Sequence, residues 1–412
     1  MRFPDTARPR AAILGDLEAM KEGDADWRHG RVPLYVFKST DAVAELGREA
    51  FNAYFTENAL GAKRAFSSLK RMEEEVVAMA LDLFRAGPGA VGNMTTGGSE
   101  SILMAVKAAR DHARKQRGDK SHRGNLVVPA SAHPAFNKAA MLMDLEVRRV
   151  PVGADFRADA AAMSAAVDAD TIMMVGSAPC FPYGVIDGIA DLGRVAEAKG
   201  LWLHVDACVG GYVAPFVRDE GFPIPDFDFQ VAAVTSLSAD LHKFGFCPKP
   251  SSTVFCRSEA FRAGQGFVID EWPNGRFATE TLTGTRAGGA VAAAWAVMQS
   301  LGRDGYRRIA RDLMTMRDGY IAGIEAIPGF TVFGKPHLTL LGFGASDLDM
   351  ARVAEGMQKR GWVPGMLKAP HGLHLMLSML HAEARPDYLR DLAASADEVR
   401  ATSGKARIEA VY

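Results

Sequence analysis

Short apolar runs alternate with helical or loop segments through the middle of the chain. The runs lie at residues 126–128, 147–150, 172–175, 201–205, 231–234 and 253–255. Strands that alternate with helices are typical of an α/β domain. The pattern therefore predicts a sheet covered by helices, with the last two runs forming a hairpin.

Helical spacing dominates on either side of this region. An amphipathic helix is expected to begin at Ser67 and to end at the Gly87-Pro88-Gly89 break, because apolar positions between them recur with a helical period. Two further helices are expected near 287–301 and 307–324. Apolar runs at 330–333, 338–343 and 374–377, with helices at 348–360 and from Pro386 onwards, predict a smaller α+β domain. We expect an N-terminal arm at residues 1–60, a large domain at 61–300 and a small domain at 301–412.

Composition narrows the classes of function. The 412 residues are 48% hydrophobic and can bury a large core, while 48 basic and 49 acidic residues nearly cancel. This balance argues against nucleic acid or an anionic membrane as a partner, and no run approaches the roughly 20 apolar residues of a membrane span. The four cysteines, Cys180, Cys208, Cys247 and Cys256, show neither a C-x-x-C pair nor metal-ligand spacing. We expect reduced thiols, no metal site and a cytoplasmic protein without a signal peptide.

A glycine-rich turn precedes the longest helical pattern of the first half. Gly97-Gly98-Ser99-Glu100 leads into a helix that extends to about Arg117. The glycines allow close approach of a ligand, Ser99 can cap the helix, and the free N–H groups of a helix N-terminus suit a phosphate. A simple capped helix is the alternative. The segment is neither a Walker loop nor G-x-G-x-x-G.

Polar side chains stand at the ends of two predicted strands. Asp206 ends the very apolar run 201–205, where a carboxylate needs a positive or hydrogen-bonding partner to stay charged. It could also be a core aspartate bonded to backbone N–H groups. His133 follows the run 126–128 and precedes a helix, so its ring could stack on a flat ligand or simply pack.

The segment V-T-S-L-S-A-D-L-H-K-F-G (234–245) carries the third cluster. Here His242 and Lys243 lie side by side between the apolar Leu241 and Phe244. Such a lysine can act as an amine nucleophile toward a carbonyl, although an ordinary loop is the alternative. Because an unperturbed lysine has a pKa of about 10.4, the site must either favour its neutral form or hold it as a Schiff base.

Together these parts are those needed to hold pyridoxal phosphate. Lys243 would bond the aldehyde, Asp206 would keep the pyridine nitrogen protonated, and the helix after Ser99 would hold the phosphate. His133 would stack on the ring, and His242 could contact the phosphate or the substrate. The sequence therefore predicts an enzyme that uses this cofactor as an electron sink.

Five segments also resemble a known family. They are T-T-G-G-S-E-S-I-L-M-A-V-K-A-A-R-D (95–111), H-P-A-F-N-K-A-A (133–140), G-S-A-P-C-F-P-Y-G-V-I-D (176–187), H-V-D-A-C-V-G-G (204–211) and T-S-L-S-A-D-L-H-K-F-G-F-C-P-K (235–249). In this order they look like the sphingosine-1-phosphate lyase branch of the pyridoxal-phosphate-dependent group II decarboxylase family. The resemblance implies a fold-type I α/β architecture with a seven-stranded, mostly parallel sheet. It also implies a homodimer with active sites at the subunit interface.

The resemblance assigns roles to matching positions. Lys243 resembles the Schiff-base lysine, Asp206 the partner of the ring nitrogen and His133 the stacked residue, and with His242 they form the expected catalytic set. Gly98, Ser99, Ser238 and His242 resemble the contacts on the phosphate side of the cofactor, and the expected cofactor contacts also include Gly97, Cys208 and Thr285. Thr285 lies in T-L-T-G-T-R-A-G (281–288), which is similar to the stretch that reaches the neighbouring subunit's cofactor. Substrate contacts are expected from Tyr54, Tyr183, Lys249 and Arg286.

The implied activity is that of a carbon–carbon lyase acting on an amine. Retro-aldol cleavage of a β-hydroxy amine, possibly phosphorylated, would give an aldehyde and a smaller amine. One departure bears on the substrate: Glu57-Asn58-Ala59-Leu60 stands where the family has an Asn-Pro-Leu-His-like segment whose His helps to bind the substrate's phosphate. An amino-acid decarboxylase is the alternative, and a cofactor-binding scaffold without catalysis is a remote one.

Overall fold

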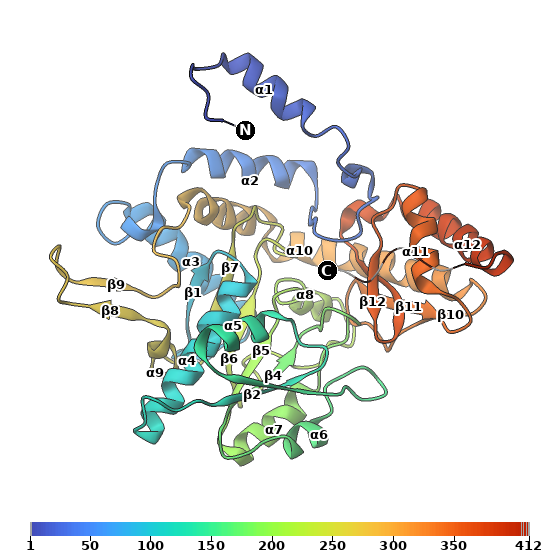
Figure 1. The fold of residues 1–412 in the computed structure, drawn as a ribbon. Coiled ribbons are helices and arrows are strands. Elements are labelled where there is room, and N and C mark those ends of the chain that lie inside the picture. Colours follow the sequence, from blue (N-terminus) through green and yellow to red (C-terminus); the bar gives the residue numbers. More distant parts are fainter. Residues whose placement is uncertain (1, 405, 407, 409, 411–412) are drawn as a thin grey trace.

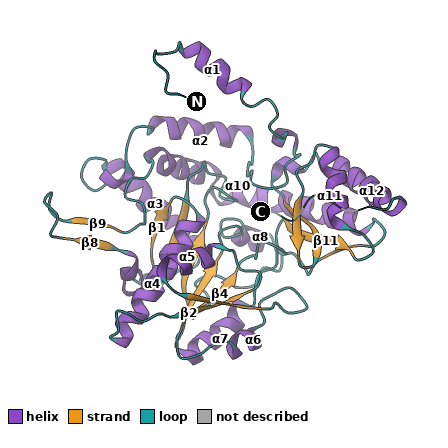
Figure 2. Cartoon of the chain, in the orientation of Figure 1, coloured by secondary structure: helices purple, strands orange, loops and turns teal. Residues whose placement is uncertain are grey.

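A seven-stranded sheet forms the centre of the molecule. The computed structural model describes residues 2–404, 406, 408 and 410. The strand order is β1-β7-β6-β5-β4-β2-β3, and only β7 runs antiparallel to its neighbours. The strands are β1 (Val91–Thr95), β2 (Asn125–Pro129), β3 (Glu146–Val150), β4 (Thr171–Ser177), β5 (Trp202–Asp206), β6 (Val234–Ala239) and β7 (Ser252–Cys256). The expected seven-stranded, mostly parallel sheet is confirmed, and β6 and β7 are antiparallel neighbours as expected. Figure 2 shows strands in orange at the centre of the molecule with helices in purple around them.

Two strands differ from the sequence prediction. A strand was expected at 231–234, but β6 occupies Val234–Ala239. Its hydroxyl side chains resemble a loop in sequence, yet they are buried and bonded within the sheet. β1 was not predicted, because Gly92 and Asn93 interrupt its apolar pattern. Gly92 is needed there, since a Cβ would lie 2.3 Å from the ring of Phe255.

Helices cover both faces of this sheet, as Figure 1 shows. Alternate residues of a strand point to opposite faces. Accordingly Leu126 and Val128 pack with α4 and α5, whereas Val127 joins the core on the opposite face. The helices of this part are α3 (Ser67–Leu83), α4 (Gly98–Arg117), α5 (Ala135–Met143), α6 (Ala160–Ala165), α7 (Ile189–Lys199), α8 (Ala214–Asp219), α9 (Glu259–Arg262) and the 3-10 turn η3 (Ala263–Gln265). The predicted helix from Ser67 is confirmed by α3.

A second, smaller sheet lies beside the first (Figure 1). Its order is β10-β11-β13-β12, and all its pairs are antiparallel. Its parts are β10 (Phe330–Val332), β11 (Leu340–Ala345), α11 (Met350–Lys359), β12 (Gly365–Lys368), β13 (His371–Met376), η4 (Met379–His381) and α12 (Arg385–Ala401). The predicted strands and helices of this region are present, and β12 is an addition to them.

A long helix connects the two sheets. α10 spans Gly288–Glu325 and bends at Gly302, where φ is 53°. The two helices predicted at 287–301 and 307–324 are therefore the two halves of one kinked helix. The predicted domain boundary between residues 300 and 301 falls inside it, next to the kink.

The N-terminal segment and one hairpin lie at the outside of the main body, and the first helix and the hairpin extend away from it (Figure 1). They consist of α1 (Arg10–Ala19), η1 (Trp27–His29), α2 (Asp41–Ala53), η2 (Ala59–Gly61) and the hairpin strands β8 (Phe267–Ile269) and β9 (Phe277–Thr279). α1 buries none of its residues, whereas α2 packs along α10. Across the part of the chain that the structure describes, no helix combines the length and apolarity needed to span a membrane.

Candidate active site

A cavity of about 380 Å³ opens where strands β4, β5 and β6 end. Ligand sites of α/β sheets gather at these carboxyl ends, beside the N-termini of the following helices. The predicted residues that line it are Gly97, Gly98, Ser99, His133, Asp206, Cys208, His242 and Lys243. Three sequence clusters up to 146 positions apart, from Gly97 to Lys243, are thus brought together by the strand order.

The N-terminus of α4 forms one wall of the cavity. The helix begins at Gly98 with Gly97 as its N-cap, so the expected capping by Ser99 is wrong. Ser99 lies in the first turn, exposed at the cavity. A Cβ on Gly98 would lie 2.8 Å from Asp240 Oδ2 and 2.9 Å from Cys208 Sγ, so only glycine fits without displacement. Free N–H groups at this end suit an anionic group.

Glu100 fixes this turn and was not predicted. Its Oε2 accepts hydrogen bonds from the backbone N–H (2.7 Å) and the hydroxyl (2.5 Å) of Thr96. Its Oε1 accepts from the backbone N–H groups of Leu282 (3.0 Å) and Thr283 (3.2 Å). Glu100 therefore ties the start of α4 to the loop 281–288. No local motif signals this contact, because its partners are 182 and 183 positions away.

Asp206 lies at the end of β5 and faces the cavity. Its Oδ1 accepts a hydrogen bond from the backbone N–H of Cys208 at 3.0 Å and one from Ser238 Oγ at 3.4 Å. Both bonds end on the same oxygen, so Oδ2 is not needed to hold the carboxylate in place. The two interpretations of Asp206, a core aspartate bonded to backbone and a cavity carboxylate, are therefore compatible.

His133 stands on the cavity wall just before α5. Its Nδ1 accepts the backbone N–H of Ala135 at 3.1 Å, which orients the ring. Burial lowers the pKa of His133, although the charge of Asp206 opposes this shift. A neutral, oriented imidazole is suited to stacking on a flat ring.

Lys243 is paired with a carboxylate that was not predicted as a site residue. Its Nζ lies 2.9 Å from Asp240 Oδ2, and His242 Nε2 lies 3.6 Å from the same oxygen. Burial, the largest single effect, would lower the pKa of Lys243. The charge and the hydrogen bond of Asp240, together with Cys208 and Asp206 nearby, outweigh burial and raise the pKa above its ordinary value. The expectation that the site favours a neutral lysine is therefore wrong. The alternative, a lysine held as a Schiff base, stays a prediction.

His242 is held from its other ring nitrogen. Its Nδ1 accepts the backbone N–H of Ser251 at 3.2 Å. Burial lowers the pKa of His242, against the charge of Asp240.

Asp240 was not predicted as a site residue. The signal in the sequence that could have identified Asp240 is its position three residues before Lys243, within one turn of the chain.

Two predicted cofactor contacts lie outside this cavity. Ser238 is fully buried one layer behind Asp206, where its hydroxyl meets His204, Cys208 and Asp206. An enclosed hydroxyl cannot reach a phosphate in the cavity, so the expected phosphate contact is corrected. Thr285 is exposed and accepts a hydrogen bond from Asn58 Nδ2 at 3.1 Å.

The four predicted substrate residues also lie away from the cavity lining. Tyr183 donates its hydroxyl to the backbone carbonyl of Ala369 at 2.5 Å. Lys249 is exposed and does not line the cavity. Tyr54 ends α2 and packs against the core. Their roles toward a substrate stay predictions.

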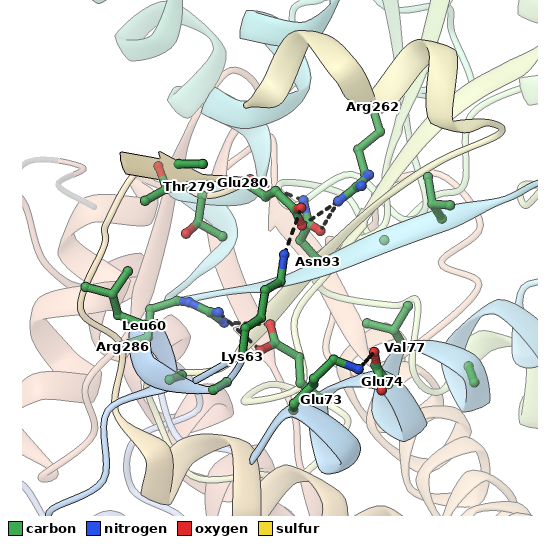
Figure 3. Close-up of a pocket in the computed structure, with 18 of the residues that line it drawn as sticks. Leu60, Lys63, Glu73, Glu74, Val77, Asn93, Arg262, Thr279, Glu280 and Arg286 are labelled. Atoms are coloured by element: carbon green, nitrogen blue, oxygen red, sulfur yellow. Dashed lines mark hydrogen bonds and ion pairs between the residues drawn. The ribbon is translucent and has the colours of Figure 1, made fainter. Parts of the chain in front are cut away.

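Arg286 lines a second cavity of about 520 Å³ (Figure 3). Its guanidinium pairs with Glu73 at 2.7 Å and 3.1 Å. On the opposite side of this cavity Glu280 lies between Lys63 and Arg262. The two Nη atoms of Arg286 are held by Glu73 and its Nε is buried without a partner, so Arg286 does not reach the first cavity.

The cavity with Lys243 suits pyridoxal phosphate in its donor set. It offers an amine for an aldehyde, a carboxylate for a ring nitrogen, an imidazole for a flat ring and a helix N-terminus for a phosphate. Asp206 and Lys243 are independently fixed by their neighbours. The residues present therefore fit the cofactor.

Comparison with known proteins agrees with this chemistry. The family described as "Pyridoxal-dependent decarboxylase conserved domain" matches residues 67–346. A sphingosine-1-phosphate lyase of Oryza sativa subsp. japonica is 39% identical over 400 residues, covering 95% of this chain and 74% of the relative. A probable L-aspartate decarboxylase of Pyrococcus abyssi is 30% identical over 393 residues, covering 95% and 98%. The solved sphingosine-1-phosphate lyase of Burkholderia pseudomallei K96243 superposes with a TM-score of 0.93 at 36% identity, covering 97% of this chain and 93% of that one.

Fold and site together define a lyase dependent on pyridoxal phosphate, built on the α/β decarboxylase fold. The chain belongs to the pyridoxal-dependent decarboxylase family.

Proposed function

We propose that this lyase cleaves the bond between the amine-bearing carbon and the neighbouring hydroxyl-bearing carbon of a phosphorylated long-chain amine. The relatives named sphingosine-1-phosphate lyases support this substrate class, since they match 95% of the chain at up to 39% identity. The observation that carries the chemistry is the single cavity that brings together Lys243, Asp206 and His133.

Each of these residues has a part in the proposed reaction. Lys243 would bond the cofactor's aldehyde carbon, and an amine substrate would take its place. Asp206 would hold a proton on the ring nitrogen, and His133 would cover one face of the ring. Bound pyridoxal phosphate supplies a ring that accepts the electron pair released when the bond breaks. The substrate hydroxyl must lose its proton when this bond breaks. His242 and the amine of Lys243 line the same cavity and are the proposed bases.

The N-terminus of α4 is proposed to hold the cofactor's phosphate. Gly98 brings the backbone close, and Ser99 adds an exposed hydroxyl at the same wall. The substrate's own phosphate needs a separate cation. Lys249 is proposed for this role, because it is a cation in the same loop as His242 and Lys243.

The active form is proposed to be a cytoplasmic homodimer. The loop 281–288 is anchored by Glu100, yet Thr285 is exposed and is not among the residues that line the cavity of its own chain. Leu282 in the same loop is 58% exposed. Large apolar residues of the β8–β9 hairpin are also exposed, by 39–53%. A second copy that covers these residues would receive Thr285 at its own cofactor.

An amino-acid decarboxylase is the second candidate, favoured by the P. abyssi relative that matches over almost its full length. Both candidates use the same cofactor residues and differ in their products. We would incubate the cofactor-loaded protein with sphinganine phosphate and, separately, with a panel of amino acids. Release of a long-chain aldehyde supports the lyase, and release of CO₂ supports the decarboxylase. If neither product forms from any substrate, both candidate functions are wrong. A parent protein that takes up no cofactor, and so lacks the absorbance band that Lys243→Ala should lose, would overturn the cofactor assignment as well.

A further inference from the structure

A chain of buried hydrogen bonds runs behind Asp206 from the start of β5 to its end. Trp202 Nε1 donates to Ser236 Oγ at 2.7 Å, and Ser236 Oγ lies 2.8 Å from His204 Nδ1. His204 Nε2 lies 3.2 Å from Ser238 Oγ, which donates to Asp206 Oδ1 at 3.4 Å. None of these residues exposes more than 7% of its surface. The reaction as described so far makes no use of this histidine.

The strand register assembles the chain. His204 is paired with Ser236, and Asp206 with Ser238, across the parallel strands β5 and β6. Residues 202, 204 and 206 share one face of β5, since side chains of a strand alternate. The same rule puts both serines on one face of β6, between the side chains of β5. This explains why β6 contains hydroxyl residues at positions that face the core.

The available hydrogen atoms give this series of hydrogen bonds a single direction. Asp206 accepts as a carboxylate, so Ser238 must spend its only hydrogen on it and can only accept from His204 Nε2–H. A neutral His204 then accepts at Nδ1, and Ser236 donates to it. Ser236 in turn accepts from the indole of Trp202, which can only donate. Every donor therefore points toward Asp206, and the His204 tautomer with hydrogen on Nε2 is the one that satisfies all four bonds.

The surroundings keep this histidine neutral. Burial lowers the pKa of His204 to about 4, although the charge of Asp206 acts in the opposite sense. Its ring packs edge-on against Phe136, with centroids 5.8 Å apart. A core histidine with only a packing role would not need both ring nitrogens directed along one line toward a cavity carboxylate.

We propose that His204 is a positioning residue that acts through Ser238 to hold the Oδ1 of Asp206, leaving Oδ2 for the ring nitrogen of the cofactor. The proposal rests on the proposed role of Asp206. It also gives Ser238 a function different from the phosphate contact expected from sequence. Chains of this kind strengthen the hydrogen bonds within them, and in a buried site they fix one geometry.

The test compares two cofactors in the full-length protein after removal and replacement of the bound cofactor. One is pyridoxal phosphate, and the other is its analogue with carbon in place of the ring nitrogen. Both carry the same aldehyde and phosphate, so the ratio of their dissociation constants isolates the contact of Asp206 with the ring nitrogen. We expect the parent protein to prefer the natural cofactor by about 10-fold or more, as for a hydrogen bond to a charged group.

Variants then interrupt the chain. Ser238→Ala and His204→Leu should each reduce this preference by about 3- to 10-fold. His204→Gln should retain most of it, because its amide can still donate to Ser238. Thr171→Val removes another buried hydroxyl from the same sheet, one bonded to Asn125 at the opposite strand end, and should leave the preference unchanged. Ser238→Ala is a small deletion and keeps the test decisive where His204→Leu does not fold.

The outcomes separate the two ideas. If the parent protein shows no preference for the ring nitrogen, the role of Asp206 is wrong and the proposed function loses its support. If the parent discriminates and Ser238→Ala discriminates equally well, only the positioning role of His204 is overturned. An independent measurement is ¹⁵N NMR of histidine-labelled protein, with His204 assigned from His204→Gln. It should show the Nε2–H tautomer at neutral pH, and an Nδ1–H or charged ring would overturn the proposal.

Discussion

The carboxylate of Asp240 lies 2.9 Å from the amine of Lys243, and both groups belong to the same turn after β6. Asp240 is 2% exposed and also accepts a hydrogen bond from Ser252 Oγ at 2.5 Å. Behind it Ser252 contacts Ser101 at 2.8 Å, and Ser101 contacts Thr95 at 2.6 Å. The proposed cofactor lysine is therefore held by an ion pair that is itself anchored in the core.

Replacing Asp240 by Asn should lower the pKa of Lys243. The folded-state pKa of this lysine is raised because Asp240, with smaller contributions from Cys208 and Asp206, outweighs burial. Removing the charge of Asp240 takes away the largest of the effects that oppose burial. A shift of about one to two pH units is expected for the loss of a buried charged hydrogen bond. The measurement is the pH profile of acylation at Lys243 in cofactor-free protein, followed by peptide mass spectrometry.

Asp206→Asn is the matched control for this experiment. It removes another cavity carboxylate but keeps the 2.9 Å contact of Asp240 with Lys243, so its shift should be smaller. Identical acylation profiles for the parent and Asp240→Asn would show that Asp240 does not hold the proton on Lys243.

Gly98 and Gly97 form a matched pair of adjacent glycines. A methyl group on Gly98 would lie 2.8 Å from Asp240 Oδ2 and 2.9 Å from Cys208 Sγ, whereas one on Gly97 would come no closer than 3.8 Å to His242. Gly97 has φ of 172°, an extended backbone that alanine adopts. Gly98→Ala should therefore weaken cofactor binding by about 10-fold or more by displacing Asp240, and Gly97→Ala by much less. Binding can be followed by fluorescence titration, and equal affinities in the two variants would contradict this account.

The fold was predictable where burial and periodicity agree. The runs that became β2, β4 and β5 are largely apolar because both faces of the sheet are covered there, and α3 shows clean helical spacing. The edge strand β3 instead carries the exposed Arg149. β6 was placed too early because Ser236 and Ser238 are polar in sequence and buried in the structure. Their partners lie on β5, and no local pattern contains that information.

The site was predictable to the extent that its chemistry is local. Lys243 and Asp206 each stand next to a strand end, which the sequence indicates by itself. Glu100 could not be found in this way, because its carboxylate binds backbone groups 182 and 183 positions away. Arg286 was expected near a substrate, but its nearest carboxylate, Glu73, lies 213 positions earlier and holds it elsewhere.

Glu100→Gln should loosen the loop that follows β9. One carboxylate oxygen of Glu100 accepts the backbone N–H groups of Leu282 and Thr283, and the other accepts from Thr96. The amide of Gln has only one acceptor oxygen, so it cannot keep both sets of bonds. Hydrogen exchange at these two amides should accelerate by about 10-fold or more. Hydrogen-exchange mass spectrometry of the peptide covering 281–288 measures it.

Glu280→Gln provides the control for the same loop. It weakens the contacts with Arg262 and Lys63 but leaves both bonds to Glu100 intact. Its exchange at residues 282 and 283 should match that of the parent protein. If Glu100→Gln also matches the parent, Glu100 is not what anchors this loop.

Stability should decrease as the pH falls through the range set by His374. Burial lowers its pKa to about 4 in the folded protein, while its Nε2 contacts the carbonyl of Phe181 at 2.8 Å. An unfolded histidine takes up its proton near pH 6.5, so between about 6.5 and 4 the unfolded state binds more protons and gains in stability. The loss of unfolding free energy that His374 causes approaches about 3 kcal/mol at the acid end of this window.

The effect of His374 is isolated by comparing variants. His204 and His337 have pKa values lowered to about 4 by burial and act in the same sense, whereas burial raises the pKa of Asp187 to about 6 and acts in the opposite sense. His374→Gln should therefore flatten the pH dependence of the unfolding free energy in urea by about 1 to 3 kcal/mol. Replacing the exposed His371 by Gln should leave the slope unchanged. An unaltered slope in His374→Gln would mean that the folded protein accepts a proton at this site as readily as the unfolded chain does.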